Sequence, residues 1–403
     1  MTRISMNFHE RVKGGSGFDA SARRERLDLR SGEWVQVRSE AEILATLTRE
    51  GKLDSLPFMP EMLKYCGQKF LVSKRADKTC DTISSSPTGL RRMRSAVHLA
   101  DVRCNGDAHD GCQAGCLLFW KEAWLERAEV AQSVRKSATA TSDAGARAEA
   151  ERIRQADCTC TREMLTGAAR SMNECGDSIY TCQATELLRA TSGLSWWHVA
   201  QYVRDVRFGN ATLVQFVRAG FIGVFNKLQV LLRRFVPTRF LFQEGLKYPF
   251  IRGRLTQTPK ELLNLQPGDL VEVKSKEEIV ATLDTNSRNR GLLFDREMVS
   301  HCGRRARVLR RVNRIVDERT GRMLELTSDS LILEGMYCRG DFNRFCPRSI
   351  YGFWREIWLK RVPDQPTASY EPSASDQDQC MARCGAHDVR EHPAMRDAGV
   401  LTH

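Results

Sequence analysis

The chain has 403 residues, with 62 Lys+Arg against 50 Asp+Glu and a formal net charge of +12. This length predicts two to three domains, and the positive charge permits an anionic partner, although a solvated basic surface is the simpler explanation. No apolar segment typical of a signal peptide and no run of 18 apolar residues occurs, so neither a signal peptide nor a transmembrane helix is expected. Fourteen cysteines without a secretory signal then predict a reducing, cytoplasmic location.

The N-terminal part of the sequence recurs further along the chain. Residues 27–67, beginning LDLRSGEWVQVRSEAEILATL, align without gaps with residues 263–303, beginning LNLQPGDLVEVKSKEEIVATL. One related phrase follows in each copy, CNGDAHDGCQAGCLLFWKEAWLER from Cys104 in the first and CRGDFNRFCPRSIYGFWREIWLKR from Cys338 in the second. Residues shared by the aligned copies include glycines, cysteines and the pair Glu61 and Glu297. The sequence therefore predicts a tandem duplication.

Each copy has the same predicted order of local structure. GEWVQV and GDLVEV alternate in polarity after a turn glycine, which predicts a half-buried strand. A capping box then predicts a short helix, at Ser39–Glu42 in the first copy and Ser275–Glu278 in the second. A second short helix is expected to end at Gly67 or Gly303, and strands are expected around the turn DERTG. This pattern favours a small, partly open barrel of SH3-like type.

The predicted fold class is α+β, with two duplicated β-rich modules and a helical middle segment. We expect an N-terminal tail (1–26), repeat module 1 (27–130), a linker (131–157), a helical cysteine-containing segment (158–250), repeat module 2 (258–362) and a disordered tail (363–403).

The cysteines of the repeats are candidate metal ligands, because zinc takes four thiolate, imidazole or carboxylate donors from turns and strand ends. Each copy has three of these cysteines: Cys66, Cys104 and Cys112 in the first, and Cys302, Cys338 and Cys346 in the second. The first copy adds two further donors, His109 and Cys116, and His301 could serve in the second copy. The alternative is that they are small buried apolar residues, as free cysteine often is.

The middle segment has a second candidate set, Cys158, Cys160, Cys175 and Cys182. Four cysteines within 25 residues suit zinc or an iron–sulfur cluster, although the spacing matches no ferredoxin pattern. The alternatives are cysteines in a helical core or a redox pair.

The end of each phrase places two tryptophans four residues apart, Trp120 with Trp124 and Trp354 with Trp358. At helical spacing they form one apolar stripe, which predicts a helix packed in the core. Glu122 and Glu356 between them are expected to face solvent or to pair with arginine.

Two further features suggest partners. Basic residues recur after Gly67 and Gly303 and could contact phosphates, but aromatic residues are sparse beside them, so a solvated strand face is favoured over nucleic-acid binding. Residues 213–232 form a broad apolar stripe flanked by basic residues. We favour a core helix packed against both modules, with an interfacial membrane helix as the alternative.

No nucleotide-binding, serine-hydrolase or H-E-x-x-H motif is present. We therefore expect a cytoplasmic metal-binding tandem-repeat protein, with zinc as the ion, that acts as an interaction or assembly module for a protein partner. The alternatives are a metal- or thiol-dependent enzyme with its site in repeat module 1, or RNA or anionic-membrane binding through the basic strands.

Overall fold

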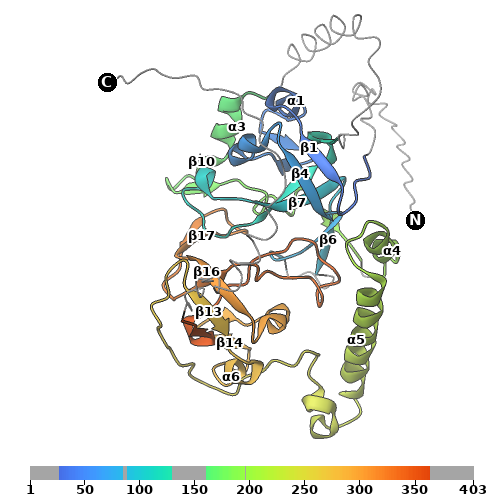
Figure 1. Cartoon of the computed structure of the whole chain (residues 1–403), viewed down its shortest axis with the longest axis vertical. Coiled ribbons are helices and arrows are strands. Elements are labelled where there is room, and N and C mark those ends of the chain that lie inside the picture. Colours follow the sequence, from blue (N-terminus) through green and yellow to red (C-terminus); the bar gives the residue numbers. More distant parts are fainter. Residues whose placement is uncertain (1–26, 85–88, 129–159, 196, 364–403) are drawn as a thin grey trace, which may run out of the picture. The chain divides into compact units, whose positions relative to one another are not determined.

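The computed structural model describes residues 27–84, 89–128, 160–195 and 197–363, and shows a mixed α and β structure (Figure 1). The predicted N-terminal tail, the predicted linker, Cys158 and residues 364–403 lie outside the described residues. The described residues up to Val362 belong to one compact unit.

The N-terminal β region, residues 27–128, is built on a five-stranded antiparallel sheet that forms half a barrel. Its strand order is β8 (Leu117–Lys121), β7 (Ala96–Arg103), β4 (Lys69–Arg75), β1 (Trp34–Val37) and β9 (Leu125–Arg127). Alternation in β1 buries Val35 and Val37 completely and leaves Trp34 exposed. The predicted strand is thereby confirmed.

The C-terminal β region, residues 263–362, has a four-stranded sheet of order β19 (Leu331–Leu333), β16 (Arg305–Arg311), β13 (Leu270–Val273) and β20 (Leu359–Arg361). Val271 of β13 pairs with Ala306 and Arg361. Val35 of β1 pairs with Phe70 and Arg127 in the same way. The alignment of the sequence therefore matches the register of the two sheets.

The predicted capping boxes are present in both regions. Ser39 caps α1 (Glu40–Leu44) and Ser275 caps α6 (Lys276–Val280), with reciprocal bonds to the glutamate three residues on. The second predicted helices are 3₁₀ helices, η1 (Pro60–Tyr65) and η6 (Arg296–His301). Gly67 and Gly303 then adopt positive φ angles of 75° and 74°.

The predicted Trp–Trp helix is wrong, although the four tryptophans are buried. Trp120 lies in β8, and Trp124 ends the 3₁₀ turn η3 (Glu122–Trp124). Phe58 contacts both rings edge-on, and Phe294 does the same for Trp354 and Trp358. A strand followed by a tight turn thus brings residues four apart onto one core as a helix would.

A glutamate between each pair of tryptophans is buried against an arginine. Arg75 Nη1 lies 2.7 Å from Glu122 Oε1, and Arg311 Nη1 lies 2.6 Å from Glu356 Oε1. Each carboxylate also accepts from the backbone of the segment that precedes β1 or β13, through Leu29 N–H in the first region. Of the two expectations for these glutamates, pairing with arginine is confirmed.

The middle segment is only partly helical. It contains α3 (Arg162–Ala168), the hairpin β10 (Arg170–Met172) and β11 (Ser178–Tyr180), β12 (Ser192–Gly193), α4 (Ala200–Arg207) and α5 (Leu213–Leu232). The remaining short elements are β2 (Lys52–Leu53), β3 (Leu56–Pro57), β5 (Lys78–Cys80), β6 (Leu90–Arg92), β14 (Arg288–Asn289), β15 (Leu292–Leu293), β17 (Arg314–Val316), β18 (Met323–Glu325), η2 (Asp107–His109), η4 (Thr238–Phe240), η5 (Phe242–Gly245) and η7 (Glu356–Trp358). Strands β17 and β18 flank the predicted DERTG turn.

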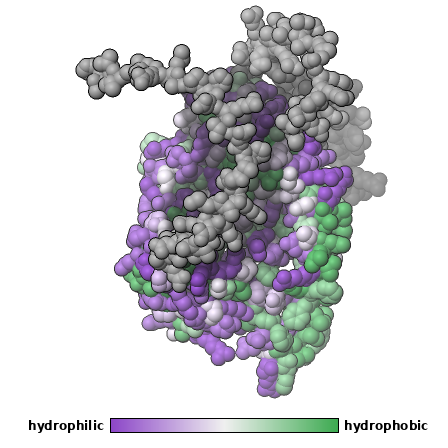
Figure 2. Space-filling model, in the orientation of Figure 1, coloured by the Kyte–Doolittle hydropathy of each residue, from purple (hydrophilic) through white to green (hydrophobic). Residues whose placement is uncertain are grey.

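Helix α5 does not pack in a core, so the favoured prediction for residues 213–232 is wrong. Gln229 is its buried residue, whereas Val214 is 78% and Phe221 73% exposed. Hydrophobic residues gather along the edge of the surface where Figure 1 places this helix (Figures 1 and 2). The sequence pattern specified an apolar helix but not what the helix contacts.

Candidate metal centre

The repeated phrase folds as a tight loop that turns His109 inward. Gly106 has φ 85°, and a Cβ atom there would lie 2.0 Å from the carbonyl oxygen of Cys112. Its own carbonyl oxygen accepts from the N–H groups of His109 and Gly111. A side chain at this position would clash, so glycine is required for the loop to close. The turn η2 leaves the His109 side chain buried.

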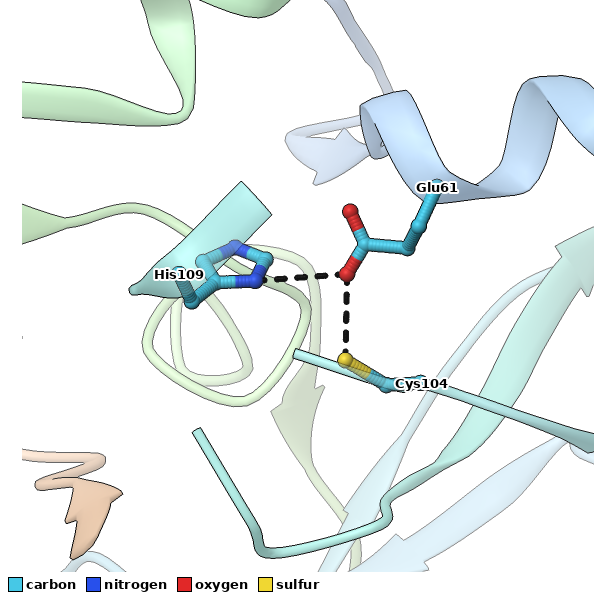
Figure 3. Close-up of side chains that lie close together, drawn as sticks. All are labelled: Glu61, Cys104 and His109. Carbon is cyan, nitrogen blue, oxygen red and sulfur yellow. Dashed lines mark hydrogen bonds and ion pairs between the residues drawn. The ribbon is translucent and has the colours of Figure 1, made fainter. Parts of the chain in front are cut away.

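His109 and Cys104 meet the carboxylate of Glu61, which η1 carries (Figure 3). Glu61 Oε1 lies 3.2 Å from His109 Nδ1 and accepts from Cys104 Sγ at 3.0 Å. One sulfur, one nitrogen and one oxygen atom of these residues all lie within 4.8 Å of one another. Glu61 Oε2 is buried and has no hydrogen-bond partner among the described residues. A buried oxygen without a partner is costly, so this cluster has an unused acceptor.

The orientation of the His109 ring suits a metal ligand. Its Nε2 lies 3.1 Å from the carbonyl oxygen of Thr181, an acceptor, so Nε2 carries a proton and donates it. Nδ1 is then the atom that faces Glu61 and Cys104. A metal-binding histidine typically donates its other ring N–H to a carbonyl or carboxylate, which fixes the tautomer.

Protons occupy this cluster when no ion does. Burial, together with the negative charge of Glu61, raises the pKa of the Cys104 thiol well above its usual value. Burial alone would raise the pKa of Glu61, but hydrogen bonds and charge from His109 and the bond from Cys104 lower it overall. A metal ion would have to displace the thiol proton, because the thiolate is the ligand. The raised pKa also makes Cys104 a poor nucleophile, since reactive cysteines have lowered pKa values.

A cavity of about 50 Å³ adjoins the cluster. Cys104 and His109 line it, together with Cys112, Cys116 and Cys182. The space exceeds the roughly 10–15 Å³ that one water molecule needs. The first-copy candidates of the sequence analysis therefore surround one cavity, except for Cys66.

Cys66 and Cys302 lie elsewhere, each at the end of its 3₁₀ helix. Both are half-buried and pack against the hydrophobic cores, and burial raises the pKa of each thiol to about 11. These contacts match the alternative that they are small apolar residues.

Cys112 and Cys346 each accept a hydrogen bond from the other β region. Cys112 Sγ accepts from Val316 N–H at 3.3 Å, and Cys346 Sγ accepts from Cys80 N–H at 3.0 Å. Val316 and Cys80 end the equivalent strands β17 and β5. The two contacts are thus reciprocal and join the two regions.

The second copy does not assemble the same cluster. Asn343 stands where the first copy has His109, and Glu297 accepts from the N–H groups of Asp341 and Phe342 at 3.1 and 2.6 Å. His301 Nε2 lies 3.2 Å from the Tyr337 carbonyl oxygen, and its Nδ1 faces Arg304. Cys338 is half-buried, and burial raises the pKa of its thiol to about 12.

The described cysteines of the middle segment are not gathered into one group. Cys160 is buried in the N-terminal core and Cys175 is exposed on the β10–β11 hairpin. Cys182 lines the cavity beside His109. Among the described residues, Glu61, Cys104 and His109 are the one group of three donors close enough to share an ion. No contact among these three described cysteines supports an iron–sulfur cluster.

Most recurrent basic side chains of the strands are paired within the protein. Arg75 and Arg311 hold the buried glutamates, Lys78 pairs with buried Asp205, and Arg305 pairs with Glu272. These contacts occupy charges that phosphate binding would need.

Sequence reasoning missed one participant, Glu61, and assigned Cys182 to a separate candidate set in the middle segment. Glu61 could have been found, because a charged residue retained at the same aligned position of both copies indicates a buried partner. The position of Cys182 beside the first-copy cavity carries no sequence signal, since only the tertiary fold brings the middle segment to the first copy.

Comparison with protein-family models, with curated proteins and with solved structures gives no match to the chain. No helix in the described ranges is both long enough and apolar enough to cross a membrane.

Proposed function

We propose that the protein binds one zinc ion at Glu61, Cys104 and His109. The observation that carries this proposal is the convergence of sulfur, nitrogen and oxygen donors within 4.8 Å, beside an unpartnered carboxylate oxygen. Zinc accepts such mixed donor sets, whereas calcium and magnesium prefer oxygen alone. The cavity next to Cys104 and His109 leaves room for a fourth ligand from water or from a neighbouring thiol.

The ion is proposed to be structural and to fix the phrase loop of a duplicated module. Equal capping boxes, equal strand registers and the paired tryptophan clusters support the duplication and a small, partly open SH3-like barrel in each copy. Burial of the cluster and the raised pKa of Cys104 favour a structural site over the alternative enzyme. In this proposal the module serves protein interaction or assembly.

The metal content of protein purified without a tag tests the site. Elemental analysis is expected to give about one zinc per chain, and His109→Asn, which installs the residue of the second copy, is expected to abolish it. The matched control is Cys338→Ser, which changes the residue equivalent to Cys104 and should keep the ion. A wild-type chain without zinc that also fails to take it up in titration would refute the proposal, as would a His109→Asn chain that keeps it.

A second candidate function is docking on an anionic membrane surface through α5. The helix exposes large apolar side chains, and no acidic residue occurs between Asp205 and Glu244, a stretch that has six basic residues. Apolar burial with flanking basic charge is the chemistry of an interfacial helix.

Vesicle co-sedimentation tests this second function. The protein is expected to sediment with phosphatidylserine-containing vesicles and less with phosphatidylcholine alone. Phe221→Asp should release it, whereas Met172→Asp, a change of a side chain 68% exposed on the β10–β11 hairpin, should not. Equal binding of both variants would exclude α5 as the docking element.

A further inference from the structure

A pocket of about 410 Å³ lies on the C-terminal β region. Leu293, Met298, Cys338, Asn343 and Phe353 are among its lining residues, and Cys80 of the N-terminal region adds to the wall. Its volume lies within the roughly 300–1,000 Å³ typical of ligand pockets. The pocket occupies the position that corresponds to the small cavity beside His109, since the aligned residues line both.

In the N-terminal region the corresponding space is filled by Gln183. Its side-chain amide donates from Nε2 to the carbonyl oxygens of Pro57 at 3.0 Å and of Phe119 at 2.9 Å. Its Oε1 accepts from Phe119 N–H at 2.8 Å. Gln183 is 4% exposed, so these bonds form away from water. One carboxamide thus satisfies both backbone groups of Phe119.

The second copy retains residues equivalent to those that surround Gln183 but has no described equivalent of Gln183 itself. Leu293 aligns with Pro57, Met298 with Met62 and Phe353 with Phe119, and all three line the open pocket. Among the described residues no group bonds the N–H or the carbonyl oxygen of Phe353. Gln183 belongs to the middle segment. No described segment covers the pocket of the second copy as the segment around Gln183 covers the first copy.

We propose that this pocket binds the glutamine side chain of a protein partner, presented on a short peptide segment as residues 182–184 present Gln183. A carboxamide offers both the donor and the acceptor that the Phe353 backbone requires. A carboxylate would place an acceptor against a carbonyl oxygen, and an aliphatic side chain would leave both backbone groups without partners. The proposal concerns the second copy and needs no metal ion in the first.

A peptide with the sequence of residues 178–190, labelled and with serine at the cysteine position, is the probe, titrated against the full chain by fluorescence anisotropy. Saturable 1:1 binding is expected, and replacing the glutamine of the probe by alanine or glutamate should weaken it roughly tenfold or more. Leu293→Trp, at a side chain 41% exposed, should block the pocket and abolish binding. The control is Leu324→Trp, 44% exposed on β18 and not among the pocket residues.

Four results would overturn the proposal. The first is a lack of saturation at several hundred micromolar, and the second is equal binding of the alanine probe. The third is full binding by the Leu293→Trp chain, because the peptide would then be displacing Gln183 in the first copy. The fourth is that N-acetyl-glutaminamide binds as tightly as the peptide, which would assign the pocket to a small-molecule amide. Binding by His109→Asn protein should equal that of wild type, so failure of the zinc site and failure of this pocket are separate outcomes.

Discussion

Replacing Arg75 by methionine is expected to destabilise the protein more than the equivalent change of Arg311. Arg75 is 1% exposed, and Glu122 at 4% would retain one donor from the described part of the chain, the N–H of Leu29. Arg311 is 30% exposed, and its partner Glu356 would retain the N–H groups of residues 263–265. The loss thus leaves a poorly satisfied buried charge in one region and a well-satisfied one in the other.

A buried charge that loses its counter-ion costs about 3–5 kcal/mol, whereas loss of one bond between charged groups costs about 1.5–3 kcal/mol. We expect Arg75→Met near the first range and Arg311→Met at or below the lower end of the second. The double change Arg75→Met with Glu122→Leu should recover much of the loss, because apolar residues of similar volume remove the buried charge.

Native-state hydrogen exchange with mass spectrometry measures both changes, because peptides from β4 and β16 report the two regions separately. Urea unfolding followed by tryptophan fluorescence gives the global value. An Arg311→Met loss equal to or larger than that of Arg75→Met would refute the reasoning, and so would a double variant no more stable than Arg75→Met.

Three further predictions concern the loop and its thiols. Gly106→Ala should lower the melting temperature and the zinc content far more than Gly67→Ala, because only the Cβ at position 106 meets backbone, and equal losses would contradict this. Burial raises the pKa of Cys116 to about 12. The stability that the neutral thiol contributes is therefore complete below the pKa of the unfolded chain, about 8.5, and falls by about 1.4 kcal/mol per pH unit above it. The decrease of the unfolding free energy with rising alkaline pH, measured by urea unfolding, should be smaller in Cys116→Ala. The lowered pKa of Glu61 gives stability above about pH 4.3 that is lost as the pH falls through the pKa of the folded state. The unfolding free energy of metal-free Glu61→Gln protein should therefore decrease less steeply with falling pH than that of the wild type. An unchanged pH dependence would exclude this role.

Local structure was predictable where the residues themselves determine it. Ser39 with Glu42 specifies a capped helix start, and the alternation of β1 specifies its buried face. The spacing of Trp120 and Trp124 did not separate a helix from a strand followed by a turn, because both place the rings on one side. The proximity of the Cys104 thiol and the His109 imidazole could be predicted, since the two residues are five positions apart.

Longer-range features were not predictable from the pattern. Glu61 joins the cluster from 43 residues before Cys104, and the closure of the first copy depends on Gln183 from the middle segment. Nothing in the periodicity of residues 213–232 shows whether another element covers α5. In each case the missing information is which distant surface the element meets.

The reciprocal contacts of Cys112 and Cys346 have a consequence for the covalent chain. Each β region supplies a sulfur acceptor to a strand end of the other, so each half completes the other as separate fragments of a split protein do. Covalent connection makes the association of the halves intramolecular, at an effective concentration that the length and stiffness of the connecting segment determine. Produced as two polypeptides, the halves would reassemble only above their mutual dissociation constant, and their stability would then depend on dilution.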